Sequence, residues 1–461
     1  MVAVTPRPIP AARPAEDATG RRDQPERPAE EWSIAAETLP PHETWSADER
    51  RAAQAARLAA GLPDVLAGNP FYRAKLAAAG IRDAREITLG SWAAVPFTTK
   101  TELSADQAAH QPYGTNLSYP LERYVRYHQT SGTTGKPLRI LDTAASWAWW
   151  MECWADIYRA AGVTAADRVF FCFSFGPFVG FWSAFAGAEH LGALCISGGA
   201  LSTPERVHAL LATEATVLVC TPTYALRLAE VAREEGVDLA RSSLRVSIHA
   251  GEPGASIPAT RDRIEEAFGV RAYDHTGGTE VGATGFSCTA RDGVHLIERG
   301  FLAEILDPAT GAVRDEGDGE LVLTNLGRWG SPAIRYRTGD RVRALRGRCS
   351  CGRTLVKLEG GIQGRVDDMV VVRGVNVFPS AIESVVRRFP ELAEFRIEAA
   401  EERGMVELTL TLEPLAGVDV TIGERVADEI HRDIGVRCAV ALVAPGTLER
   451  FEMKARRFRR T

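Results

Sequence analysis

Short apolar runs alternate with segments of helical spacing through the middle of the chain, between residues 121 and 300. The runs that indicate buried strands are residues 169–173, 193–196, 216–219 and 246–248. The segments that indicate the intervening helices are residues 147–160, 204–213, 224–235 and 259–268. Because strands that alternate with helices fold into layers, this pattern predicts α/β structure with a largely parallel sheet.

The pattern changes toward both ends of the chain. Residues 47–62 have helical spacing, and a second helix is expected from residues 69–72 to near Gly80. Residues 301–342 contain short strands separated by Gly and Asp turns, which favours antiparallel structure. We expect these strands to form a β-barrel-like part of one large N-terminal domain, over residues 46–364.

A smaller α+β unit is expected after Gly364. Its elements are a strand at residues 369–372, a helix at 380–388, strands near 395–399 and 406–412, and a helix at 422–434. The sequence therefore predicts an α/β protein with a small C-terminal domain over residues 365–461. The boundary between the domains is expected at residues 364–368.

Residues 1–45 differ in composition from the rest of the chain. They are rich in Pro, Ala, Arg and Glu, with almost no large apolar residues before Trp32. Such a segment cannot bury enough surface to offset its ordering entropy, so we expect a disordered leader.

Composition narrows the class of protein. The chain has 461 residues, 45% of them apolar and 25% charged, with a formal net charge of −6. No basic field therefore indicates nucleic acid or a membrane surface as a partner. The sequence has no apolar stretch long enough to span a bilayer and no signal-peptide core. Four of its cysteines lie in apolar segments and are interpreted as core residues of a cytoplasmic protein: Cys153, Cys172, Cys195 and Cys220.

Residues 130–137 form a polar motif, Thr-Ser-Gly-Thr-Thr-Gly-Lys-Pro, after a run at 121–127 that is expected to be a strand. Gly132 and Gly135 allow the backbone to approach an anion closely, and Lys136 adds a positive charge. The hydroxyl groups are those of Thr130, Ser131, Thr133 and Thr134. The motif is not a Walker-type P-loop, because its glycines are too close together and Pro137 follows the lysine. It indicates a polyphosphate-binding turn; the alternative is an ordinary polar surface turn.

Four further motifs follow along the chain: Ala250-Gly-Glu-Pro253, residues 274–280, Tyr336-Arg-Thr-Gly-Asp340 and Gly364-Arg-Val-Asp-Asp368. The ordered set resembles that of the acyl-adenylate-forming (AMP-binding) enzyme superfamily. Residues 96–100, 221–225 and 373–380 are similar to the phenylacetate–CoA ligase branch of that superfamily. The resemblance runs from roughly residue 65 to residue 460.

The resemblance implies an AMP-forming acid–thiol ligase with two half-reactions. A carboxylate attacks the α-phosphate of ATP and forms an acyl-adenylate, with release of pyrophosphate. A thiol, expected to be that of CoA, then displaces AMP. The first step brings two anions together, so the site must supply positive charge, which Mg²⁺ and cationic side chains provide.

The resemblance and the side-chain chemistry imply individual roles. Glu280 would hold Mg²⁺ beside the triphosphate, and Thr279 would reach the α-phosphate. Asp340 would accept both ribose hydroxyls, and Arg365 would reach the ribose or the phosphates. The residues expected to bind the rest of the nucleotide are Gly251, Glu252, Pro253, Asp274, His275 and Thr276. The structural alternatives are a strand end at Asp340, a surface charge at Arg365 and a helix cap at Glu280.

Residues 451–455 resemble the last motif of the superfamily, whose lysine contacts the carboxylate and the α-phosphate. Lys454 would fill that catalytic role, although Met453 and Glu449 stand where glycine and proline are usual. The alternative is one more cation in a basic C-terminal end. By resemblance, the small domain is mobile and pivots at Asp367, and Gly374 leaves room for a pantetheine arm.

Four residues suggest a structural zinc site: Cys288, His295, Cys349 and Cys351. Three thiolates and one imidazole complete a tetrahedral set with no open position for catalysis. The phenylacetate–CoA ligase-like branch is similar in carrying a Cys/His cluster at matching positions. The alternative is a set of reduced core cysteines.

An aromatic acid is the expected substrate. Ring-bearing residues would form one side of its pocket, namely Phe175, Phe178, Phe181 and Trp182, and the other side would consist of Ala250, Gly277 and Gly278. Flat acids would stack on such rings; core packing is the alternative. Phe181 stands where relatives have glycine and Thr276 where they have tyrosine, which puts phenylacetate itself in doubt. His249 and His275 could contact a ring substituent or lie as polar residues at strand ends.

Other readings stay open at this point. The acyl group could pass to a carrier protein or an amine, or the enzyme could adenylate nitrite for diazotisation. A nonenzymatic protein that binds zinc and a nucleotide is the alternative of another class. The resemblance also leaves the oligomeric state open, a homodimer included.

Overall fold

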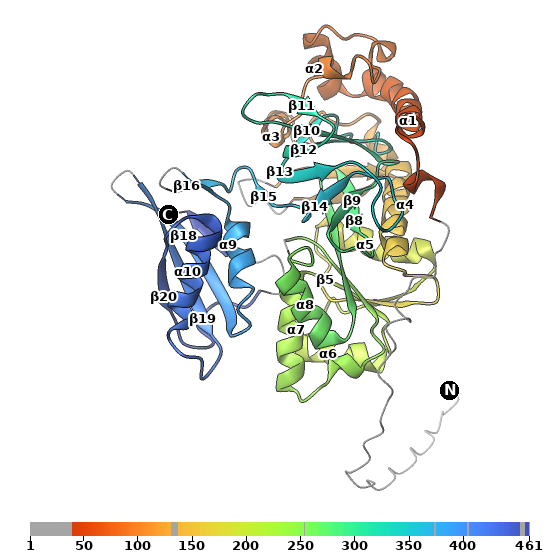
Figure 1. The fold of residues 1–461 in the computed structure, drawn as a ribbon. Helices are drawn as coiled ribbons and strands as arrows, with labels where there is room; N and C mark the ends of the chain where they lie inside the picture. The colour runs from red at the N-terminus through yellow and green to blue at the C-terminus, as the bar shows by residue number, and fades with distance from the viewer. Residues whose placement is uncertain are drawn as a thin grey trace, which may run out of the picture. The chain divides into compact units, whose positions relative to one another are not determined.

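The computed structural model describes residues 39–130, 137–252, 254–372, 375–402, 405–451 and 457–460. Among these residues a long mixed sheet carries most of the fold, and a four-stranded sheet belongs to a smaller unit toward the C-terminus (Figure 1). None of the described helices is long and apolar enough to cross a bilayer.

Five parallel strands form one half of the long sheet, in the order β4-β3-β5-β6-β7. They are β3 (Arg168–Phe171), β4 (Leu194–Ser197), β5 (Val217–Cys220), β6 (Val246–His249) and β7 (Arg271–Gly278). The connecting helices are α5 (Val179–Leu191), α6 (Thr203–Ala212), α7 (Pro222–Glu234) and α8 (Pro258–Phe268). The expected parallel α/β structure is confirmed, and α5 is a helix that the sequence pattern did not predict.

Side chains of this half alternate between two helical layers. On β3, Val169 and Phe171 face the core shared with α5 and with α4 (Ala144–Ala160), whereas Phe170 faces the core under α6, α7 and α8. On β5, Val219 faces the core shared with α4 and α5, and Leu218 faces the core under α6, α7 and α8. Because both of its faces are covered, β5 is apolar throughout instead of alternating with polar residues.

The sheet continues into antiparallel strands in the order β7-β8-β9-β14-β13-β12-β10-β11, with β15 paired to β13. Their bounds are β8 (Gly282–Ser287), β9 (Gly293–Leu296), β10 (Phe301–Leu306), β11 (Val313–Arg314), β12 (Gly317–Asn325), β13 (Tyr336–Leu345), β14 (Lys357–Glu359) and β15 (Gly364–Arg365). Strand β7 joins the two halves, because it is parallel to β6 and antiparallel to β8. The antiparallel structure expected at residues 301–342 is confirmed, and the large sheet extends through Arg365.

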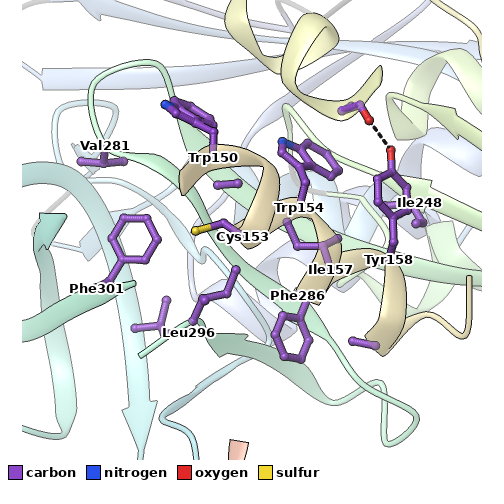
Figure 2. Packing of buried hydrophobic residues seen from close by; sticks show 14 of the residues in the cluster. Trp150, Cys153, Trp154, Ile157, Tyr158, Ile248, Val281, Phe286, Leu296 and Phe301 are labelled. Carbon is purple, nitrogen blue, oxygen red and sulfur yellow. Dashed lines mark hydrogen bonds between the residues drawn. The ribbon is translucent and has the colours of Figure 1, made fainter. Parts of the chain in front are cut away.

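Helix α4 packs against β8 in the largest buried apolar cluster (Figure 2). Trp154 and Tyr158 project from this helix, and their polar atoms are paired with α5. The Trp154 Nε1–H donates to Ser183 Oγ at 2.9 Å, and the Tyr158 hydroxyl donates to the Ala184 carbonyl at 2.7 Å. Burying these aromatic residues therefore leaves neither polar group unsatisfied.

Three helices and a hairpin precede α4 among the described residues: α1 (Ala47–Gly68), α2 (Pro70–Ala78), α3 (Lys100–Ala109), β1 (Tyr124–Gln129) and β2 (Arg139–Thr143). Ser46 and Glu49 form a capping box at the start of α1, and Asn69 caps α2. The strand expected from residue 121 begins only at Tyr124, because Leu121–Arg123 form a 3-10 turn.

The expectation of a disordered leader up to residue 45 is wrong for residues 39–45. Pro41–Glu43 form a 3-10 turn, and Glu43 is buried in an ion pair with Arg353 at 2.8 Å. Thr354 donates to the carbonyl oxygens of Glu43 and Trp45. The local composition missed this order because Arg353 lies 310 positions away in the sequence.

The C-terminal unit contains β16 (Val370–Val372), β17 (Val375–Val377), α9 (Pro379–Val386), β18 (Leu392–Glu402), β19 (Met405–Pro414), α10 (Ile422–Ile434), β20 (Ala439–Leu442) and β21 (Phe458–Arg460). Strands β18 and β19 are antiparallel, while β20 and β21 pair in parallel at the two edges. Ile382 of α9 and Val426 of α10 share one core with Phe395 and Leu410. The expected α+β composition of this unit is confirmed.

Candidate active site

The sequence-predicted phosphate loop lies between β1 and β2 along the chain. Thr130 is buried at the base of the loop, where its N–H donates to the Leu138 carbonyl and its Oγ1 accepts from the Leu138 N–H, each at 3.0 Å. The Gln129 N–H donates to the Pro177 carbonyl at 2.9 Å. The remainder of the predicted loop lies outside the described residues: Ser131, Gly132, Thr133, Thr134, Gly135 and Lys136.

Arg328 holds the backbone of the turn that carries Thr279 and Glu280, between β7 and β8. One nitrogen of its guanidinium, Nη1, donates to the carbonyl oxygens of Thr279 at 2.6 Å and Glu280 at 3.2 Å. Its other nitrogens form two 2.7 Å hydrogen bonds with Asp142 on β2, and both side chains are fully buried. The turn is thereby tied to the hairpin that carries the predicted phosphate loop.

The Glu280 carboxylate contacts two side chains that come from other elements. Lys100 Nζ, at the start of α3, lies 3.3 Å from Glu280 Oε1. The Tyr336 hydroxyl hydrogen-bonds Glu280, and burial followed by that negative charge raises the pKa of Tyr336 well above its usual range. The phenol is therefore protonated and donates to Glu280. A bridge between Thr98 and Tyr336 aligns the segment before α3 with the first residue of β13.

Asp340 and Arg365 are register partners on β13 and β15. Arg365 Nη1 lies 3.2 Å from Asp340 Oδ1, and the same guanidinium bonds Asp367 Oδ1 at 3.0 Å. Asp340 and Arg365 also act on the pKa of Tyr336 through their charges. Glu280, Asp340 and Arg365, which were expected to surround one nucleotide, thus lie around Tyr336.

Glu252 lies at the N-terminus of α7. Its carboxylate accepts a hydrogen bond from the Thr223 N–H at 2.9 Å, an arrangement that the positive end of a helix stabilises. Gly251 has φ of +100°, so a side chain would be strained at this turn. Ala250 is half-buried beside it, and Pro253 lies outside the described residues.

Asp274, His275 and Thr276 are buried on β7. Burial raises the pKa of Asp274 to about 7, although hydrogen bonds from Ser256 and from the His275 N–H oppose the shift. His275 Nδ1 lies 2.9 Å from the Gly285 carbonyl oxygen, its ring lies 4.3 Å from that of Trp154, and burial lowers its pKa to about 4. The hydroxyls of Thr276 and Thr284 are 3.0 Å apart. His275 therefore lies in the core as a neutral residue.

His249 is also a neutral core residue. Its ring nitrogens contact the Cys220 carbonyl at 3.2 Å and Ser247 Oγ at 2.8 Å, and burial lowers its pKa to about 4. The reading of His249 and His275 as polar residues within strand structure is the one that these contacts favour.

The aromatic residues expected around the acid form a cluster at the start of α5. Phe181 stacks on Phe173 with ring centroids 4.2 Å apart, and Phe175 lies 4.8 Å from Trp182. Phe178 meets Phe181 edge-on at 6.4 Å. The cluster is only partly buried, and 39% of Trp182 is exposed. Of the expected opposite side, Gly277 is exposed and Gly278 half-buried.

Two sequence-predicted residues of the C-terminal unit, Gly374 and Lys454, lie outside the described residues. Arg457 follows Lys454 by three positions and is buried. Its Nε and Nη2 donate to the two carboxylate oxygens of Glu394 at 2.6 and 2.9 Å. The chain after Lys454 is therefore anchored on β18.

The four predicted zinc ligands are brought together. Their donor atoms all lie within 4.8 Å of one another, with Cys288 Sγ 3.9 Å from Cys349 Sγ and Cys351 Sγ 3.6 Å from His295 Nε2. The hydrogen bond from Cys288 is the largest cause that lowers the pKa of Cys351. Cys288 follows β8, His295 lies on β9, and the other two cysteines lie between β13 and β14.

Sequence reasoning missed three residues of the site. Lys100 and Tyr336 lie within motifs that carried the family resemblance, so their positions were marked but no role was assigned to them. Arg328 lies in no such motif, and its partner Asp142 is 186 positions away. The sequence shows no signal that pairs these two residues.

Two protein-family models match parts of this chain. A model of AMP-binding enzymes matches residues 121–327, and a model of the AMP-binding enzyme C-terminal domain matches residues 374–460. The chain is 34% identical over 430 residues to phenylacetate-coenzyme A ligase of Pseudomonas putida, which covers 90% of this chain and 95% of the relative. It is 34% identical over 436 residues to the Escherichia coli K12 enzyme of the same name, covering 90% and 96%.

A solved structure extends the comparison to the fold. The 2-hydroxyisobutyryl-CoA ligase in its postadenylation state is 32% identical to this chain, with a TM-score of 0.85 and coverage of 92% and 94%. The fold is thus that of an adenylate-forming enzyme. Within that class, the chain belongs to the phenylacetate–CoA ligase-like branch of the AMP-binding enzymes. It is an AMP-forming CoA ligase, which activates a carboxylic acid with ATP and transfers the acyl group to CoA.

Proposed function

We propose that the acid activated by this ligase is aromatic. The observation that carries the proposal is the partly exposed ring cluster at the start of α5, where Phe181 stacks on Phe173 and Phe175 contacts Trp182. The Gln129–Pro177 hydrogen bond joins this segment to the strand that leads into the phosphate loop. A planar ring held there gains stacking energy that an aliphatic acid does not.

A panel of acids tests this proposal. Pyrophosphate release is measured with benzoate, phenylacetate, cinnamate and hydroxy- or amino-benzoates, and with 2-hydroxyisobutyrate as the aliphatic comparison. We expect at least one aryl acid to exceed the aliphatic acid in kcat/KM. A preference for the aliphatic acid over every aryl acid contradicts the proposal. Mass spectrometry of the products with and without CoA identifies the acyl-CoA that each acid forms.

In the proposed adenylation step, Glu280 would hold Mg²⁺, which would supply positive charge to the triphosphate, and Asp340 would accept the ribose hydroxyls. The phosphate loop at residues 130–136 supplies hydroxyl and amide donors for the β- and γ-phosphates, and Thr279 reaches the α-phosphate. Lys100 and Tyr336 orient the Glu280 carboxylate through their contacts with it. The negative charge that develops on the attacked phosphate is thus met by fixed donors and cations.

Lys454 completes the proposed step by neutralising charge between the acid and the α-phosphate. We propose that it reaches the site when the small domain, residues 365–461, turns about Asp367, and that a second pose presents Gly374 to the pantetheine arm of CoA. The variant Lys454→Ala is expected to lose adenylation and to keep ATP binding. Unchanged pyrophosphate release would remove Lys454 from the mechanism.

Zinc is the proposed structural metal of the Cys/His cluster. Two thiolates bound to a tetrahedral zinc at about 2.3 Å are separated by about 3.8 Å; Cys288 and Cys349 are 3.9 Å apart. The His295–Cys351 separation of 3.6 Å fits the same geometry. Bound zinc would supply no chemistry to the reaction, because the four ligands complete its coordination. Metal analysis of protein purified without chelator is expected to give one zinc per chain, and its absence would contradict the assignment.

A further inference from the structure

The segment before α1 reaches the cysteine loop, which we define as residues 349–355. The Glu43 carboxylate is buried against Arg353, with an Nε–Oε2 distance of 2.8 Å and side-chain exposures of 2% and 8%. The Thr354 N–H donates to the Glu43 carbonyl at 3.0 Å, and the Thr354 hydroxyl donates to the Trp45 carbonyl at 2.7 Å. Three hydrogen bonds thus join this segment to the loop.

Arg353 also contacts two of the predicted metal ligands. Its carbonyl accepts the Cys349 N–H at 2.9 Å, and its side chain hydrogen-bonds Cys351. The guanidinium also lies over the Phe286 ring, 5.2 Å from the centroid. Arg353 therefore contacts both cysteines of the loop.

The same loop orients the imidazole ligand. His295 Nδ1 lies 3.3 Å from the Leu355 carbonyl oxygen, which selects the tautomer with the proton on Nδ1. The other nitrogen, Nε2, is then free of a proton and points at Cys351 Sγ, 3.6 Å away. A displacement of the loop would therefore disturb the histidine and both cysteines together.

We propose that Glu43 is a positioning residue of the metal site, acting through Arg353 to hold the cysteine loop in the geometry that binds zinc. The proposal rests on the zinc site proposed above. It assigns a task to the segment before α1, which contains none of the ligands. Groups outside the ligand set that orient the ligands commonly change metal affinity by about 10- to 100-fold.

Glu43→Gln tests this proposal, because the amide keeps the size of the side chain and removes its charge. Zinc content is measured first, and release is then followed with a chromophoric chelator added to the full-length protein. We expect release about tenfold faster than from the wild type. Cobalt-substituted protein gives a second readout, since a changed thiolate–cobalt absorption band reports altered ligand geometry directly.

Glu304→Gln is the matched control. Glu304 also forms a buried pair with an arginine, Arg335, at 2.8 Å with exposures of 9% and 4%, but it lies on β10 and touches none of the four ligands. The control is expected to lower the melting temperature without changing zinc release. If both variants release zinc equally fast, general destabilisation explains the effect and the proposal is overturned.

The double variant Glu43→Gln/Arg353→Gln tests whether Glu43 affects zinc release through Arg353. If Glu43 acts through Arg353, removing Glu43 adds nothing to the release rate of Arg353→Gln; additive effects would overturn this route. If Glu43→Gln releases zinc as slowly as the wild type, only the positioning role of Glu43 is overturned. A wild-type protein that binds no zinc would overturn the zinc site as well, so the two failures are distinguishable.

Discussion

Asp142 and Arg328 form a fully buried ion pair with two hydrogen bonds of 2.7 Å, and this pair ties the Thr279–Glu280 turn to β2. Truncating one partner of such a pair leaves an uncompensated charge in the interior, which costs about 3–5 kcal/mol. Arg328→Met is therefore expected to lower the free energy of unfolding by about that amount in urea titrations.

Two further variants serve as comparisons for the stability loss of Arg328→Met. Asp142→Leu combined with Arg328→Met removes both charges and is expected to recover part of the loss. Arg51→Met removes an exposed pair with Asp315, at 3.2 Å, and is expected to cost less than about 1 kcal/mol. Equal losses from Arg328→Met and Arg51→Met would contradict the role of the buried pair.

Asp274 predicts a pH dependence of stability. Its pKa is raised by burial to about 7, from an ordinary value of 3.8. Between these values the unfolded chain has lost the proton and the folded chain keeps it, so stability falls as pH rises and levels off above about pH 7. Asp274→Asn removes this contribution, and its unfolding free energy relative to the wild type is expected to rise between about pH 5 and 7. A difference that does not change with pH would contradict the shift.

Glu280→Gln is expected to raise the Mg²⁺ concentration needed for adenylation and to lower kcat by at least about tenfold. The amide has one neutral oxygen in place of a carboxylate, and such hard cations prefer charged oxygen ligands. Pyrophosphate release as a function of Mg²⁺ at saturating ATP measures both effects. Glu265→Gln, which affects an ion pair with Arg291 instead, is the control. An unchanged Mg²⁺ dependence would refute the role of Glu280.

The proposed role of Asp340 predicts a difference in affinity between ATP and 2′-deoxy-ATP. If its carboxylate accepts the ribose hydroxyls, 2′-deoxy-ATP binds more weakly than ATP to the wild type, by about 1.5–3 kcal/mol for a hydrogen bond to a charged group. Asp340→Ala is expected to raise KM for ATP and to lose most of this discrimination. A variant that still distinguishes the two nucleotides as the wild type does would assign the ribose to another residue.

Local patterns predicted most elements of the fold, because the strands and helices between residues 121 and 300 have clear periodicity. Helix α5 was missed because Val179–Leu191 is apolar on nearly all sides, so it shows no polar face at helical spacing. The order of residues 39–45 was missed for another reason. Its stabilising partner, Arg353, is remote in sequence, and composition averages over the whole leader.

The candidate site likewise contains residues that local sequence motifs predicted and residues that they did not. Glu280, Asp340 and Arg365 lie in short motifs and were named from the sequence. All three act on the pKa of Tyr336, and their roles toward the nucleotide stay predictions. Lys100 and Arg328 act through tertiary contacts with Glu280 and the preceding turn, which no local pattern encodes. His275 lies on an interior strand, β7, and its ring packs on Trp154; its contact with the nucleotide stays a prediction.

The buried pair has a practical consequence for chimeric ligases. The segment that matches the AMP-binding enzyme model ends at residue 327, one position before Arg328. A graft cut at that border transplants Asp142 and Glu280 but takes the residue at position 328 from the recipient. Unless the recipient supplies an arginine there, Asp142 is left buried without its ion-pair partner. Crossover points are therefore better placed beyond Gly330, whose carbonyl accepts a hydrogen bond from the Tyr124 hydroxyl.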